Sequence, residues 1–127
     1  MTQVSSVKVL VADDDQPFCK MMEAILSTMD FISEVRSSQR GLIALYSCLD
    51  FRPEVVFIDS MMPAMDGDLL GSKVRSLLPH ARLVSISGSP RKETPQWADE
   101  HVLKGHDMFH RLRTIVLGTE TSAPDRT

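Results

Sequence analysis

The chain has 127 residues and a net charge of −3, which suits one domain with a single hydrophobic core. The mild acidic balance argues against a basic surface, and so against direct binding to nucleic acid or to an anionic membrane. No apolar run has the length of a membrane helix. The short polar stretch 1–6 is no signal peptide and is expected to be disordered. Cys19 and Cys48 lack metal-ligand spacing and indicate free thiols in a reducing, cytoplasmic compartment.

The first third of the chain predicts a strand, a helix and a second strand. Residues 7–12 form a β-branched run that ends at Asp13, Asp14 and Asp15. A helix is expected to follow, with Asp15 as N-cap and Pro17 in its first turn. Its apolar face should comprise Phe18, Met22, Ile25, Leu26 and Met29. Residues 31–36 alternate in polarity and predict a weaker strand near a sheet edge.

The middle of the chain continues the alternation. Ser37 or Ser38 is expected to cap a helix, and residues 55–58 form the most apolar strand, which ends at Asp59. That helix is expected to bury Leu42, Leu45, Tyr46 and Leu49. Asp66 is the expected N-cap of a third helix. Its apolar face should comprise Leu70, Val74, Leu77 and Leu78, before Pro79.

In the last third, residues 83–86 predict a strand that ends at Ser87, and residues 102–103 a very short strand that ends at Lys104. Between them, Pro90 and Pro95 disfavour a helix, and Trp97 is expected to fill space that a helix would occupy. A final helix face is expected from Met108, Phe109, Leu112, Ile115 and Val116. Residues 119–127 are polar and predict a disordered tail or linker.

Five strand–helix repeats predict an α/β fold with a doubly wound parallel sheet and helices on both faces. In the flavodoxin-like order 2-1-3-4-5, the carboxyl ends of the strands bring Asp13, Asp14, Asp59, Ser87 and Lys104 to one edge. Clustered carboxylates repel one another unless a cation lies among them, and Mg²⁺ (or Mn²⁺) prefers oxygen ligands shared with a phosphate. Together with the lysine and the hydroxyl, the cluster suits phosphoryl transfer onto an oxygen nucleophile.

These motifs resemble the receiver domain of bacterial two-component response regulators. The resemblance rests on the acidic triplet at 13–15, the Asp-x-x-Met-Pro-x-Met-Asp-Gly stretch at 59–67, Ser87-Gly88 and Lys104, and it covers residues 7–118. It implies that Asp59 is phosphorylated, and that Asp13, Asp14, Asp59 and the backbone carbonyl of Met61 hold the metal. Ser87 and Lys104 would contact the phosphoryl group, and the domain would catalyse only its own phosphorylation and dephosphorylation.

The resemblance also implies partners: a sensor histidine kinase or phosphotransfer protein, and an output that responds to a shift of the helix-four and strand-five face. A homodimer and a DNA-binding output domain outside this chain are compatible with it. Met61 and Ser89 lie where this family tunes the lifetime of the phosphate.

Three positions depart from the family pattern. Gly105 replaces the usual proline after the lysine, as in receivers of nitrate-regulator-type helix-turn-helix regulators. His101 replaces an aromatic switch residue and indicates either a packed, hydrogen-bonded side chain or a pH-sensitive switch. The stretch between Ser87 and Lys104 is short, so helix four is expected to be short or missing.

Two alternatives remain beside the phosphorylated receiver. One is a protein-binding module that keeps the fold but signals without phosphorylation through residues 89–103. The other is a phosphatase, because Asp13 and Asp15 also form the Asp-x-Asp pattern of haloacid-dehalogenase-type enzymes. The phosphatase interpretation leaves Asp59 and its motif unexplained and is the weakest of the three.

Overall fold

A computed structural model describes residues 6–62 and 65–119 of the chain. Nearly all of both expected disordered ends, and Pro63 and Ala64 of the central motif, lie outside the described residues. The strands are β1 (Val7–Ala12), β2 (Ile32–Ser38), β3 (Val55–Asp59), β4 (Arg82–Ser87) and β5 (Glu100–Leu103). They pair in parallel in the order β2-β1-β3-β4-β5, so the predicted doubly wound topology is confirmed.

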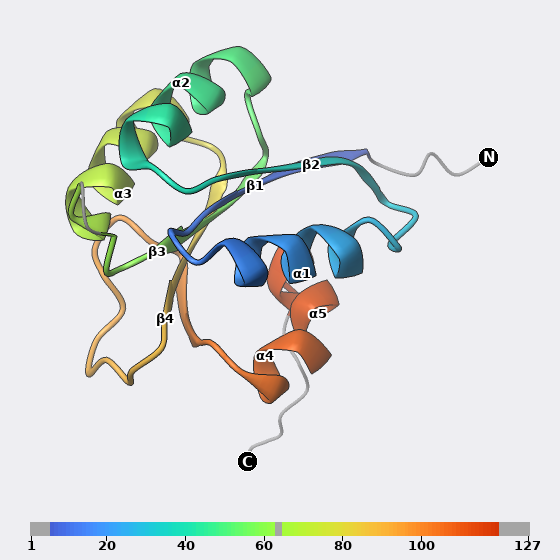
Figure 1. The fold of residues 1–127 in the computed structure, drawn as a ribbon. Helices are drawn as coiled ribbons and strands as arrows, with labels where there is room; N and C mark the ends of the chain where they lie inside the picture. The colour runs from blue at the N-terminus through green and yellow to red at the C-terminus, as the bar shows by residue number, and fades with distance from the viewer. Residues whose placement is uncertain (1–5, 63–64, 120–127) are drawn as a thin grey trace.

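Helices cover both faces of this sheet (Figure 1). They are α1 (Gln16–Leu26), α2 (Gly41–Phe51), α3 (Gly67–Leu77), α4 (His106–His110) and α5 (Leu112–Leu117). One apolar core lies between the sheet and α1, α4 and α5, and a second lies between the sheet and α2 and α3. All five residues of β3 are buried, as expected for a central strand that is covered on both faces.

The caps of α1 and α3 follow the sequence prediction. Asp15 Oδ1 accepts a hydrogen bond from the Phe18 amide at 3.1 Å, with Pro17 in the first turn. Asp66 Oδ1 accepts from the Asp68 amide at 2.9 Å. Each carboxylate satisfies one of the free amides at the start of its helix, which fixes where the helix begins.

The predictions for α2 were wrong in two respects. Its buried residues are Gly41, Ala44, Cys48 and Phe51, whereas Leu42, Tyr46 and Leu49 are half-exposed or more. The helix is apolar all round, so hydropathy could not identify the inner face; small side chains allow the closer approach to the sheet. Neither serine caps α2, because β2 continues through Ser38 and Arg40 occupies the N-cap position without a side-chain hydrogen bond.

The C-terminal helix is divided at Arg111, whose backbone (φ −101°, ψ 4°) leaves helical geometry between α4 and α5. The predicted face is otherwise correct. Met108, Leu112, Ile115 and Val116 are buried, and Phe109 packs against the same core.

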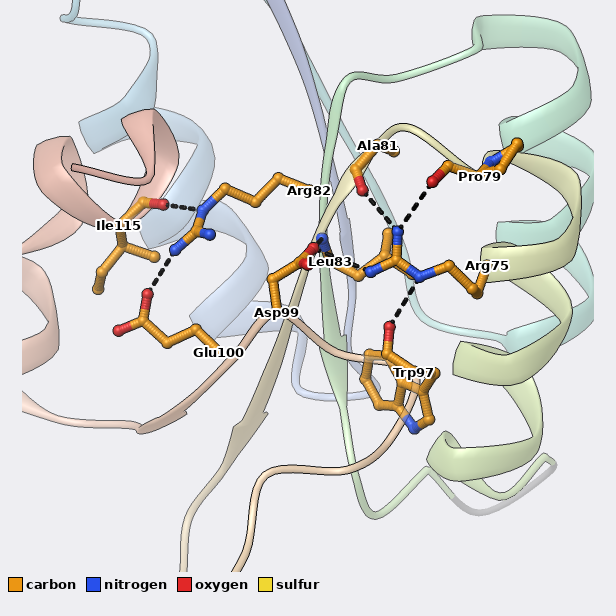
Figure 2. Close-up of polar contacts among 9 residues, drawn as sticks. All are labelled: Arg75, Pro79, Ala81, Arg82, Leu83, Trp97, Asp99, Glu100 and Ile115. Carbon is orange, nitrogen blue, oxygen red and sulfur yellow. Dashed lines mark hydrogen bonds and ion pairs between the residues drawn. The ribbon is translucent and has the colours of Figure 1, made fainter. Parts of the chain in front are cut away.

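Residues 88–99, all of them described, connect β4 to β5 without a helix. Trp97 is 5% exposed and packs on α3 at Gly71, where a Cβ atom would lie 2.1 Å from the indole. Arg75 of α3 fastens the same segment, donating from Nε to the Trp97 carbonyl at 3.0 Å and from Nη2 to Asp99 at 2.9 Å (Figure 2). The segment is therefore packed and hydrogen-bonded in the space beside α3.

Candidate phosphoryl-transfer site

The predicted site residues meet at the carboxyl edge of the sheet. Asp13 follows β1, Asp59 and Ser87 end β3 and β4, and Lys104 follows β5. Backbone hydrogen bonds fix these strand ends relative to one another: the Ser60 amide donates to the Ile86 carbonyl at 2.9 Å, and the Lys104 amide donates to the Ser87 carbonyl at 2.8 Å. The parallel register therefore sets the spacing of the site.

Asp59 lies at the bottom of the site and is 4% exposed. Its Oδ1 accepts a hydrogen bond from the Met61 amide at 3.1 Å. Burial and the negative charge of Asp13 raise the pKa of Asp59 to about 6. Gly67 permits this packing, because a Cβ atom there would lie 2.3 Å from the Asp59 carbonyl oxygen.

Asp13, Asp14 and Asp59 form an acidic cluster in which one carboxylate oxygen of each lies within 4.8 Å of the others. Asp13 is fully buried, and its Oδ1 accepts from the Asp15 amide at 2.9 Å. Its Oδ2 makes no directed hydrogen bond with a described group, although Lys104 Nζ lies 2.7 Å away. Three hard oxygen donors from carboxylates that repel one another fit a divalent cation such as Mg²⁺.

Lys104 neutralises part of this charge. Its Nζ pairs with Asp13 and lies 3.8 Å from Asp59 Oδ2, and it stands 4.6 Å from the centre of the Phe18 ring. Burial of Lys104 opposes its charged form, but Asp13 and Asp59 outweigh burial and raise its pKa. The ammonium is therefore held beside Asp59 as a fixed cation.

Ser87 is 3% exposed and lies in a chain of hydrogen bonds that runs through His101. Ser87 Oγ donates to the Ser89 carbonyl and lies 3.2 Å from His101 Nε2, and His101 Nδ1 lies 2.8 Å from Ser85 Oγ. Because Ser87 donates its proton to Ser89, His101 Nε2 is the donor to Ser87 Oγ, and a neutral ring then accepts at Nδ1 from the buried Ser85 hydroxyl. Burial and the nearby Arg91 lower the pKa of His101, which favours this neutral form.

A hollow of about 580 Å³ opens above Asp59. The predicted residues Met61, Ser87, Ser89 and Lys104 line it, and the Met61 side chain is largely exposed there. Asp68 and Arg91 also line it, and the sequence analysis missed both. Asp68 Oδ1 accepts from Trp97 Nε1 at 3.0 Å and lies 3.4 Å from Arg91 Nη1. Asp68 resembles an ordinary first-turn acid and Arg91 a loop residue, so neither carried a sequence signal.

The strand order defines a flavodoxin-like α/β protein, and the acidic cluster at the carboxyl edge of its sheet is a candidate site for a divalent cation. The family model described as the response regulator receiver domain matches residues 9–114. The chain therefore belongs to the response regulator receiver domain family. Within its described residues, no helix is both long enough and apolar enough to cross a membrane.

Two similar proteins are much longer than the segment that they share with this chain. A protein-glutamate methylesterase/protein-glutamine glutaminase of Myxococcus xanthus is 36% identical over 53% of this chain and 19% of its own length. The transcriptional regulatory protein PrrA of Mycobacterium tuberculosis is 34% identical over 60% of this chain and 32% of its own length. The chain thus matches only a third or less of either relative.

Solved structures share the fold over most of the chain. The receiver domain of AraT, a response regulator from Geobacillus stearothermophilus, is 31% identical, with a TM-score of 0.71, over 91% of this chain and 92% of its own. The response regulator TrrA of Thermotoga maritima, in complex with Mg²⁺ and BeF, is 20% identical, with a TM-score of 0.74, over 86% of this chain and 98% of its own.

Proposed function

We propose that the chain is a phosphorylation-dependent signalling receiver in which Asp59 accepts a phosphoryl group from a histidine kinase or phosphotransfer protein. The observation that supports this most is the position of Asp59, a buried carboxylate beside a fixed ammonium, at the bottom of an open hollow. The receiver would act in the cytoplasm and control an output domain or partner.

In the proposed step, an Asp59 carboxylate oxygen attacks the phosphorus of a phosphohistidine. The phosphorus–oxygen bond forms as the phosphorus–nitrogen bond breaks, and the electron pair returns to the imidazole of the donor. Asp13, Asp14, Asp59 and the Met61 carbonyl would hold Mg²⁺, which supplies positive charge against the phosphoryl oxygens when bound. Lys104 supplies a second positive charge, and Ser87 a hydroxyl at the rim.

The same groups explain how phosphorylation could be sensed. If Ser87 turned its hydroxyl toward the phosphoryl group, it would give up its bond to the Ser89 carbonyl and disturb its contact with His101. Phosphorylation of Asp59 would then change the contacts at both ends of segment 88–101, at Ser89 and at His101. This is a shift between two populations that a local charge controls.

Phosphorylation can be tested with a small acyl phosphate or phosphoramidate and Mg²⁺. The intact mass should increase by one phosphoryl group, and Asp59→Asn should abolish the increase. Asp15→Asn is the matched control, because an asparagine retains the N-cap of α1. Equal labelling of wild type and Asp59→Asn would reject the proposal.

A phosphorylation-independent binding module is the second candidate. The observation that favours it is the segment 88–99, which has no helix and is fastened to α3 by Trp97 and Arg75. Binding of beryllofluoride with Mg²⁺ separates the two candidates. If the chain with intact Asp59 does not bind beryllofluoride in the presence of Mg²⁺, the phosphorylation-independent binding module is favoured.

A further inference from the structure

The outer face of α2 is apolar although it faces solvent. Leu42, Ile43, Tyr46 and Leu49 are exposed by 58%, 50%, 63% and 50%. Their spacing places them on one side of the helix, opposite the buried residues that pack on the sheet. A helix that is apolar on all sides normally has protein on all sides, so this face calls for a covering surface.

The apolar surface continues across to α3. Between the two helices lies a hollow of about 560 Å³, lined in part by Leu45, Leu49, Leu69 and Leu77. With Leu69, which is 50% exposed, the apolar side chains of this face uncover on the order of 500 Å², near the upper end of patches on monomeric proteins. Two such faces together approach the area of a small specific interface.

Opposite charges stand exposed near the two ends of α2. Arg40 is the N-cap residue and Asp50 lies in the last turn. The C-terminus itself already has favourable basic neighbours, because Arg52 is the C-cap and Lys8 Nζ donates to the Phe51 carbonyl at 2.7 Å. Among the described residues Arg40 makes no ion pair, and the Asp50 side chain is 82% exposed with one contact, to Arg36 at 3.4 Å. Both charges are therefore available to an outside partner.

We propose that the face formed by α2 and Leu69 of α3 binds the same face of a second copy of this chain, with the two α2 helices antiparallel about a twofold axis. Antiparallel packing brings Arg40 of one copy to Asp50 of the other. It also brings Leu42 opposite Leu49, and both pairings share a midpoint near Tyr46. One axis thus covers the apolar stripe and pairs the opposite charges.

A second copy fits this face better than residues 120–127 do. Residues 120–127 contain no large apolar side chain that could cover it. A different protein would have to supply its own acid and base in the reversed order, whereas twofold symmetry supplies them automatically. The proposal goes beyond the phosphorylation chemistry, because α2 contributes no residue to the site at Asp59.

The test is the oligomeric state of the unphosphorylated 127-residue chain, measured by sedimentation velocity across a concentration series. The expected result is a reversible dimer with a dissociation constant on the order of 10 μM, as for small interfaces. Tyr46→Lys should raise this constant by about tenfold or more, because it places two ammonium groups at the axis. Leu117→Lys on α5 is the control, an exposed apolar residue on the opposite face of the sheet, and should leave it unchanged.

Charge reversal tests the symmetry itself. Arg40→Asp and Asp50→Arg should each weaken the dimer, and the double variant should recover most of the loss, since it restores opposite charges across the axis. Both positions are exposed, and circular dichroism checks that the variants fold. A chain that stays monomeric about tenfold above the expected constant would overturn the proposal. A dimer that is indifferent to Tyr46→Lys, or a double variant without recovery, would do the same.

Discussion

A single imidazole, His101, joins the hydroxyl beside Asp59 to the interior of the sheet. Its two nitrogens lie within hydrogen-bond distance of Ser87 and Ser85, and a neutral ring that donates to Ser87 accepts from the Ser85 hydroxyl. The sequence analysis left open whether this residue packs or titrates. In the structure His101 is hydrogen-bonded to both serines. Its pKa is lowered, so the folded protein binds a proton at this residue less readily than the unfolded chain does.

We predict that His101 makes the fold less stable in acid. Its folded pKa lies below that of the unfolded chain, so the unfolded state takes up the proton first as the pH falls below about 6.5. Asp68 opposes this shift more weakly than burial and Arg91 cause it. In urea unfolding, His101→Gln should therefore lose less stability than wild type between pH 7 and pH 5.

The control for this experiment is His80→Gln, at an exposed histidine after α3, which should follow wild type. Asp59 acts in the opposite direction, because its raised pKa favours proton uptake by the folded state. The difference between wild type and His101→Gln isolates the imidazole. Parallel stability profiles of these two proteins would contradict the prediction.

At the scale of elements, the connection between β4 and β5 depends on one close contact, Trp97 against Gly71. Trp97→Ala should destabilise the fold by about 3–5 kcal/mol, because it empties a buried site. Gly71→Ala should cost about 1–3 kcal/mol in wild type, because the new methyl overlaps the indole.

The double variant gives the sharper result. Once Trp97 is alanine, Gly71→Ala should become neutral or stabilising, since alanine favours a helix by about 1 kcal/mol over glycine. Urea unfolding of the four proteins measures this change of sign. A cost for Gly71→Ala that is the same in both backgrounds would show that the indole does not pack against Gly71 in solution, and the account of segment 88–99 would fail.

The sequence predicted the elements that follow one physical rule. Alternating strand and helix patterns predicted the parallel sheet, and the flavodoxin-like order 2-1-3-4-5 then predicted that Asp13, Asp59 and Lys104 meet at one edge. Prediction failed where tertiary packing decides which side of a helix is buried. The inner face of α2 is the example, because hydropathy alone did not identify it. The contacts of Arg75 could not be predicted either, because its carbonyl acceptors come from three loop residues that only the fold brings together.

For the whole molecule, the edge of the sheet is fastened to both helical layers (Figure 2). On one face, Arg75 of α3 pairs with Asp99, which also accepts from the Leu83 amide at 2.8 Å. On the other, Arg82 donates to the Ile115 carbonyl of α5 at 2.6 Å and pairs with Glu100. Successive side chains of a strand point to opposite faces, so Arg82 reaches α5 while the Leu83 side chain lies in the core beside α2 and α3.

This arrangement predicts how the fold responds to acid at Asp99. Burial opposes ionisation of Asp99, but the Leu83 amide and Arg75 outweigh burial and lower its pKa. The carboxylate therefore stabilises the fold fully above the unfolded pKa of about 3.9 and loses that contribution as the pH falls through the folded pKa. Asp99→Asn should be less stable than wild type at pH 7, and their stabilities should converge toward pH 3.

Asp30→Asn, which removes the same charge from an exposed loop, should parallel wild type throughout. A gap between Asp99→Asn and wild type that persists undiminished at pH 3 would mean that shape, and not charge, holds the edge of the sheet.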